Sequence, residues 1–317
     1  MPATIDIKQI LIDAGTKYQK EIMTAPLVAF DELKPYFNIR NKVQGKVVGG
    51  ILSVDANFRP YRTDKGASAG AKIEATEWEA FLGDLVKEFD PNEILGTLYT
   101  ERTATKADQM KIARLIALQV AKKAGEGLYD ELFTAVRNAA GNDTKDLFNG
   151  FSTIFANAVT GGDASAAKGN YLDTSATPID DTNAGDILKQ VWNSANRILK
   201  RTNAKLYVPP SVIDHYEVWY QHEFGSAPWN VNYTQRKLHS ARGKCEFVEL
   251  DNMEDQDYIY LTANKNMNIG LDAEGDLNEV EIRRVDNPKV VQLFMKTHFG
   301  TGFETIQKEF LLGVKFR

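Results

Sequence analysis

The alternation of apolar and polar residues is most regular between Thr105 and Asn138. Apolar residues recur there every three or four positions, the spacing that gathers side chains on one face of an α-helix. Thr105 and Asp108 resemble a capping box at its start. At 1.5 Å per residue, the pattern predicts a spine helix of about 50 Å with one buried face, and a bend or break is expected near Gly125. The predicted buried residues are Ile112, Leu115, Ile116, Val120, Ala124, Leu128, Leu132 and Val136.

Two extended segments joined by a long connection precede this helix. Residues 46–54 have the composition of a strand, and residues 70–75 form a second extended piece. The connection is too long for a tight hairpin turn, which predicts a protruding two-stranded loop. Because an isolated hairpin is only marginally stable in water, we expect the loop to rest on another subunit. Before it, residues 7–22 predict an amphipathic helix, and residues 30–41 an arm with little local structure.

The stretch between the loop and the spine helix also has helical spacing. Thr76 and Glu79 form a possible capping box, which predicts a helix over residues 76–89. Its apolar face would be made by Trp78, Phe81, Leu82, Leu85, Val86 and Phe89.

The second half of the chain alternates between helical and extended patterns, after a polar link at residues 138–146 that predicts a domain boundary. Residues 160–183 are poor in apolar side chains and predict a surface loop. A short strand at residues 205–208 ends at Pro209-Pro210 and leads into a helix, which is an α/β unit. The class is therefore α+β. Helices are predicted over 146–159, 183–202 and 212–224, and strands over 245–250, 258–261, 267–271, 279–285, 290–299 and 305–316.

Composition and charge narrow the function. The chain has 317 residues, 43% of them hydrophobic, and no apolar run that could span a bilayer. The N-terminal residues mix charges with isoleucines and do not resemble a signal peptide, so we expect synthesis in a cytoplasm. A single cysteine, Cys245, excludes an intrachain disulfide and a thiolate metal cluster. The net charge of −5 disfavours tight binding to nucleic acid.

The polar residues do not form a recognisable catalytic set. The four histidines, His215, His222, His239 and His298, lack the spacing of a shared metal site and are interpreted as structural or solvated. The alternative is a hydrolase or transferase built on the α/β unit, with Ser211, Asp214 and His215 as its polar residues. These three are adjacent at a helix start, which does not give the convergent geometry of a triad.

Three stretches together carry a resemblance to a known family. They are Leu147-Phe148-Asn149-Gly150-Phe151, the segment 206–216 that runs from a strand through Pro209-Pro210 into a helix, and the C-terminal strands from Asn268 through Phe299-Gly300-Thr301-Gly302-Phe303 to Val314. Their order after an arm, a long loop and a spine helix resembles the major capsid proteins of tailed bacteriophages, which have the HK97 fold.

The resemblance implies a fold and a set of domains. Residues 1–45 would be the N-terminal arm, 46–75 the E-loop, 76–145 the P-domain with its spine helix, 146–271 the A-domain, and 272–317 a return to the P-domain strands. The tip of the E-loop would contact a neighbouring subunit. Its residues would be Asn57, Phe58, Arg59, Tyr61, Arg62 and Lys65.

The resemblance also implies partners and a location. The chain would self-assemble through hexamers and pentamers into an icosahedral or prolate phage head, with no enzymatic activity and no cofactor. A separate scaffolding protein, a portal and decoration proteins would be partners, and packaged DNA would be contacted non-specifically. The protein would be made in the host bacterial cytoplasm and would reside in the virion capsid. The alternative within this fold is an encapsulin-like compartment shell.

Overall fold

The computed structural model describes residues 12–13, 17–53, 72–89, 106–225, 236–272, 279–284 and 290–317. These residues divide into two compact units, and four of the boundaries between the units fall within strands, namely β2, β3, β8 and β10. The first unit comprises Met1–Gly45, Ala80–Gly150 and Ile269–Thr301, and the second comprises Lys46–Glu79, Phe151–Asn268 and Gly302–Arg317.

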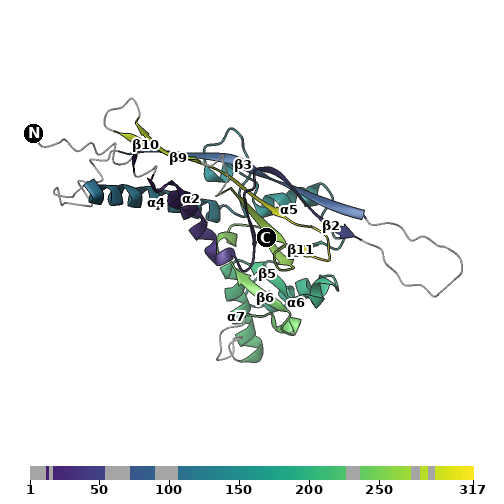
Figure 1. The fold of residues 1–317 in the computed structure, drawn as a ribbon. Coiled ribbons are helices and arrows are strands. Elements are labelled where there is room, and N and C mark those ends of the chain that lie inside the picture. The colour runs from purple at the N-terminus through teal and green to yellow at the C-terminus, as the bar shows by residue number, and fades with distance from the viewer. Residues whose placement is uncertain are drawn as a thin grey trace, which may run out of the picture. The chain divides into compact units, whose positions relative to one another are not determined.

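One sheet has, among the described residues, the strand order β1-β8-β10-β3-β2, with β9 also paired to β10. Its long strands are β3 and β10 (Figure 1), which pair in antiparallel fashion from Val291 opposite Phe89 to Phe299 opposite Phe81. The strands are β1 (Asn38–Asn41), β2 (Gly45–Ser53), β3 (Lys72–Phe89), β8 (Met267–Leu271), β9 (Glu279–Arg284) and β10 (Val291–Phe303).

The helix predicted over residues 76–89 is wrong, because these residues lie in β3. Leu82, Leu85 and Val86 would share one face of a helix, but in a strand successive side chains point to opposite faces. Leu85 packs into the core of the first unit, whereas Leu82 and Val86 are 52% and 43% exposed. Pairing with β10 therefore determines the conformation here, not the local spacing of apolar residues.

The spine helix exists as α4 (Lys106–Asp130), and it ends earlier than Asn138. It runs through Gly125 without the expected break. Its predicted buried face is partly wrong, because Leu115 is 53% exposed and Val136 is 58% exposed. Leu128 and Leu132 are buried as predicted, whereas the other buried residues described in α4 are the small Ala117, Ala121 and Gly125.

Small residues on α4 allow the preceding chain to lie close to it. Helix α2 (Gln19–Thr24) and the 3₁₀ helix η1 (Ala25–Leu33) both pack on α4. A Cβ added at Gly125 would lie 2.5 Å from the carbonyl oxygen of Pro26, which is too close for any side chain. The arm predicted to have little local structure over residues 30–41 is therefore wrong, since part of η1 and all of β1 lie there.

The motif that follows α4 is fixed by hydrogen bonds and ring packing within the first unit. Gly150 N donates to the Ala135 carbonyl at 2.8 Å, and Asn149 Oδ1 accepts from Arg137 N at 2.9 Å. The ring of Phe148 is fully buried, with its centroid 4.6 Å from that of Phe299 on β10. Residues 148–150 thus link the segment that follows α4 to the long strand β10.

The second unit is built on a sheet with the order β4-β11-β7-β5-β6 among the described residues. Helices α6 and α7 pack against each other, and both contribute to one hydrophobic core with β5, β6, β7 and β11. The strands are β4 (Tyr171–Asp173), β5 (Ala204–Val208), β6 (Cys245–Glu249), β7 (Tyr258–Thr262) and β11 (Leu311–Lys315), and the helices are α5 (Phe151–Thr160), α6 (Ala184–Ser194) and α7 (Pro210–Phe224).

Several predicted boundaries in this half need correction. Helix α5 begins at Phe151, after a short 3₁₀ turn at Thr144–Asp146, and α6 ends at Ser194, with a separate 3₁₀ turn η3 (Leu199–Arg201). The loop predicted over 160–183 contains β4, which pairs in parallel with β11. Sheet membership also differs from the predicted segments. β11 belongs to the sheet with β5, not the sheet with β10, and β8 belongs to the sheet with β10.

Candidate functional site

The residues predicted from sequence to contact a neighbour, Asn57, Phe58, Arg59, Tyr61, Arg62 and Lys65, lie outside the described residues. The strands that flank them, β2 and β3, are neighbours in the first sheet. The connection between β2 and β3 therefore joins two adjacent strands, which is the arrangement expected of a two-stranded loop. The contact made by its tip remains a prediction.

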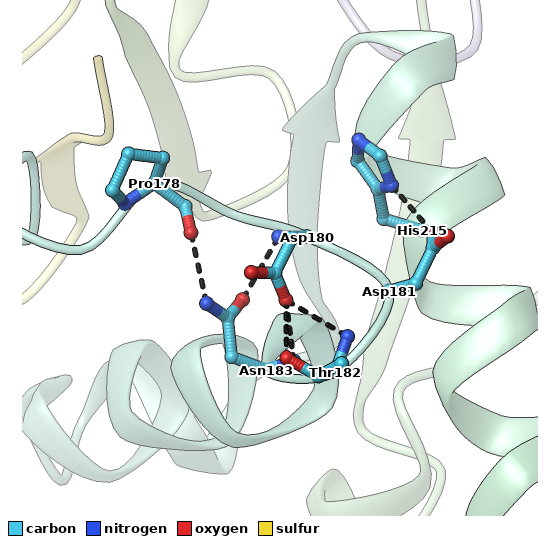
Figure 2. A network of polar contacts seen from close by, with 6 residues as sticks. All are labelled: Pro178, Asp180, Asp181, Thr182, Asn183 and His215. Carbon is cyan, nitrogen blue, oxygen red and sulfur yellow. Dashed lines mark hydrogen bonds and ion pairs between the residues drawn. The ribbon is translucent and has the colours of Figure 1, made fainter.

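The α/β unit does not assemble a catalytic triad. His215 Nδ1 lies 2.7 Å from Asp181 Oδ1 (Figure 2), and Ser211 N donates to Glu254 Oε2 at 3.4 Å. Among the hydrogen bonds of the described residues, none joins His215 to Ser211 or to the exposed Asp214. The partly exposed pair Asp181–His215 is of a kind that contributes at most about 1 kcal/mol to stability. The arrangement orients a loop and offers no activated nucleophile.

That loop is a rigid polar turn just before α6 (Figure 2). Asp180 Oδ1 accepts hydrogen bonds from Thr182 Oγ1 at 2.6 Å, from Thr182 N at 2.8 Å and from Asn183 N at 3.0 Å. Asn183 returns a bond by accepting from Asp180 N at 2.9 Å, and its amide donates to the Pro178 carbonyl at 2.8 Å. These bonds, that from the Thr182 hydroxyl above all, lower the pKa of Asp180, so its carboxylate is charged at neutral pH.

The histidines and the cysteine fit structural roles. His222 and His239 are exposed, whereas His298 is buried in β10 with its Nδ1 3.8 Å from Asp272 Oδ2. Burial raises the pKa of the Cys245 thiol to about 12, which leaves it protonated and a poor nucleophile at neutral pH. Within the described ranges, no three His, Cys, Asp or Glu side chains gather as a metal site. No described helix has the length and apolar character needed to cross a bilayer.

The described surface carries exposed apolar side chains that suit contact with protein. Leu82 and Val86 lie on the outer face of β3, and Leu115 lies on the outer side of α4. Scattered exposed apolar residues are ordinary on a monomer, so they mark no site by themselves. Sequence reasoning missed Leu82 and Val86, because the helical spacing placed them on a buried face.

Comparison by sequence identifies no relative: neither a protein-family model nor a curated protein matches this chain.

Comparison of structures finds similar chains in capsids. A chain of the satellite phage P4 procapsid is 12% identical, with a TM-score of 0.59, and the match covers 94% of this chain and 98% of that chain. A chain of the cyanophage A-1(L) capsid is 14% identical, with a TM-score of 0.55 and 93% of each chain covered. A chain of the capsid of a native GTA particle is 12% identical, with a TM-score of 0.53, covering 92% of this chain and 90% of that one. The chain therefore has the mixed α+β, HK97-like fold of these capsid chains, as its sequence predicted.

Proposed function

We propose that this chain is the major capsid, or coat, protein of a tailed phage, many copies of which close into an icosahedral or prolate head around double-stranded DNA. The observation that carries the proposal is the fold shared over more than nine tenths of the chain with capsid chains of three different particles. Fold similarity alone is a weak guide to catalysis, but a shell is a function of the whole surface and needs no grafted site.

The physical features of the chain support this role. Long strands such as β3 and β10 are costly to order in a monomer and gain stability when neighbours cover them. Leu82 and Val86 of β3 are exposed to solvent, and burial of these apolar side chains against another protein would be favourable. The polar residues of the α/β unit orient loops and do not form a nucleophile with its base. These features support a structural, non-enzymatic role without a cofactor.

The proposal assigns roles to the segments. Residues 46–75 form the E-loop, whose tip contacts the adjacent subunit, and α4 is the spine of a P-domain. The sheet with β7 at its centre is the core of an A-domain that includes β11 as well. Hexamers and pentamers of this chain form the shell, assembled in the host bacterial cytoplasm with a separate scaffolding protein. A portal and decoration proteins complete the virion, and packaged DNA touches the shell non-specifically.

Imaging of the purified protein tests the proposal. The full chain is expressed alone and together with the products of the neighbouring genes, and the product is examined by sedimentation and negative-stain microscopy. Closed particles of uniform size are expected. A compact monomer that stays stable at high concentration would contradict a shell function. Particles that enclose an enzyme and no DNA, from a gene beside that of the enzyme, would indicate an encapsulin-like compartment instead.

A further inference from the structure

Charge is unevenly distributed along the second unit. Residues 170–188 contain four aspartates and no lysine or arginine, whereas residues 187–213 contain five lysines and arginines and no acid. Residues 236–245 add four more basic residues, again with no acid between them. This separation is notable in a chain whose net charge is −5. It implies that one part of the unit is basic while another is acidic.

The fold gathers the basic residues at the start of two parallel strands. Strands β5 and β6 are in register from Ala204 opposite Cys245, and Ala204 N donates to the Lys244 carbonyl at 3.0 Å. The two turns that lead into these strands are therefore adjacent. We define the basic edge as Arg201, Arg242 and Lys244 of these turns together with Lys237, which forms a β-bridge with Glu246 of β6.

The side chains of the basic edge have no acidic partner among the residues that the structure describes. Arg242 adopts the left-handed conformation with φ of 52°, and the side chain of Lys237 passes along Gly243, its Cδ 3.8 Å from where a Cβ would lie. The charges of two nearby basic residues are balanced by carboxylates, because Lys205 pairs with Glu246 and Arg236 pairs with Glu249. No carboxylate of the described residues lies within ion-pair distance of the four residues of the basic edge.

An acidic surface lies at the other end of α6. The turn in Figure 2 carries exposed Asp180 and Asp181, and Asp186 is exposed in the first turn of the helix. We define these three residues as the acidic turn. Lys200, next to Arg201, donates to the carbonyl of Asn193 in the last turn of α6 at 2.6 Å, which places the basic edge near that end. The 11 residues of α6 separate the two surfaces by about 16 Å.

The dipole of α6 explains only part of this pattern. Acidic groups at a helix N-terminus and basic groups at its C-terminus are each favourable by about 0.3–1 kcal/mol. That effect accounts for Asp186 and for Lys200. It gives no reason for Arg242 and Lys244, which come from a separate segment before β6. A partner outside the unit accounts for both surfaces together.

We propose that the basic edge of one copy docks on the acidic turn of the next copy, as a charge-complementary head-to-tail contact around a ring of the shell. Complementary patches near the two ends of α6 are too far apart to pair within one chain, and heterologous contacts of this kind close into rings when the rotation allows. Charge pairing of this type mainly sets partner choice and association rate, and it weakens with salt. The inference rests on the proposed shell function.

A nucleic acid phosphate backbone is the other polyanion that could meet the basic edge. Tight binding to DNA generally involves about 6–10 phosphate contacts, and the basic edge offers four cations on an acidic chain. A matching acidic surface on the same unit has no role in that alternative. The second copy is therefore the better supported partner, and the experiment separates the two.

Charge reversal with rescue tests the contact in the full chain. One variant carries Arg242→Glu and Lys244→Glu, a second carries Asp181→Lys and Asp186→Lys, and a third carries all four changes. Asp180 is left in place because it holds the turn together. The control is Lys122→Glu with Lys123→Glu, an equal charge change on the exposed side of α4. Folding is checked by circular dichroism melts, and particle yield is measured by sedimentation at low and high salt.

The Arg242 and Lys244 variant should keep the parent melting temperature. The Asp181 and Asp186 variant should fold but melt somewhat lower, because it loses the pair with His215 and a favourable charge in the first turn of α6. Each should lose at least about tenfold in particle yield at low salt, because like charges then face each other. The four-residue variant should recover most of the yield, since the contact is restored with its signs exchanged, and the control should assemble like the parent. Normal assembly of either two-residue variant, or a folded four-residue variant without recovery, would overturn the contact. Normal particles that retain less DNA in the Arg242 and Lys244 variant would assign the basic edge to phosphate. If the parent forms no particles, the proposed function itself fails and this inference with it.

Discussion

At the scale of single residues, Gly125 is the clearest case of a residue whose role depends on a distant part of the chain. Sequence reasoning correctly singled it out, because glycine is a poor helix residue, and predicted a bend. The helix is continuous there, and the glycine instead allows the backbone of Pro26 to approach. The reason could not be predicted, since nothing local to residue 125 indicates that η1 crosses it.

Replacement of two glycines in the same helix tests this role. Gly125→Ala should destabilise the subunit by about 1–2 kcal/mol, because the gain of about 1 kcal/mol in helix propensity is outweighed by the clash with Pro26. Gly127→Ala is the matched control, since its Cβ would meet only Thr144 Oγ1 at 3.6 Å. It should be neutral or stabilising by up to about 1 kcal/mol. Thermal or urea melts of unassembled subunits measure both, and a stabilised Gly125→Ala would refute the close approach.

At the scale of elements, the predictions succeed where the local pattern and tertiary packing agree. The β5–α7 unit was predicted well because Pro209-Pro210 can end a strand and start a helix, and Tyr216 and Val212 then meet the core. Residues 76–89 failed because their apolar spacing fits a helix, while pairing with β10 supplies a full set of hydrogen bonds to a strand. Helix α4 was predicted, but its buried face was predicted to include Leu115. The small residues Ala117 and Ala121, which are buried, were not recognised as part of the contact face.

Two leucines of α4 test the corrected burial. Leu128 is 7% exposed and Leu115 is 53% exposed. Leu128→Ala should lower the free energy of unfolding by about 2–5 kcal/mol, because it removes buried methyl groups and leaves a cavity. Leu115→Ala should change it by less than about 1 kcal/mol, since the side chain already contacts water. Urea melts of unassembled subunits measure both changes. Equal losses of unfolding free energy in the two variants would mean that Leu115 is buried after all. A selective loss of particle yield in Leu115→Ala would assign that side chain to a contact between subunits.

At the scale of the whole molecule, the order of elements was more informative than any motif. The fold shared with capsid chains was predictable from an arm, a loop, a spine helix and an α/β unit in sequence, although no single motif is specific. Sheet membership was not predictable. β11 and β10 are consecutive strands of similar composition, yet β11 joins β4 and β7. Such long-range pairing depends on which sheet has an unpaired edge strand available, and this cannot be read from a single sequence.

The candidate surface for assembly was predicted only as a loop between two strands, and its function can be tested by removing it. Deletion of residues 57–69, with a short glycine turn joining the ends, leaves β2 and β3 intact. The described core residues all remain in the shortened chain, so we expect the melting temperature and circular dichroism of the subunit to match the parent. Particle formation should fail, because the tip residues Phe58, Arg59 and Lys65 can no longer reach a neighbour. A matched control keeps the loop length and replaces only Ala67, Ser68 and Ala69 with glycine and serine, which should assemble normally. Normal particles from the deletion would mean that the loop is dispensable and that contacts such as the basic edge and the outer face of β3 hold the shell together without it.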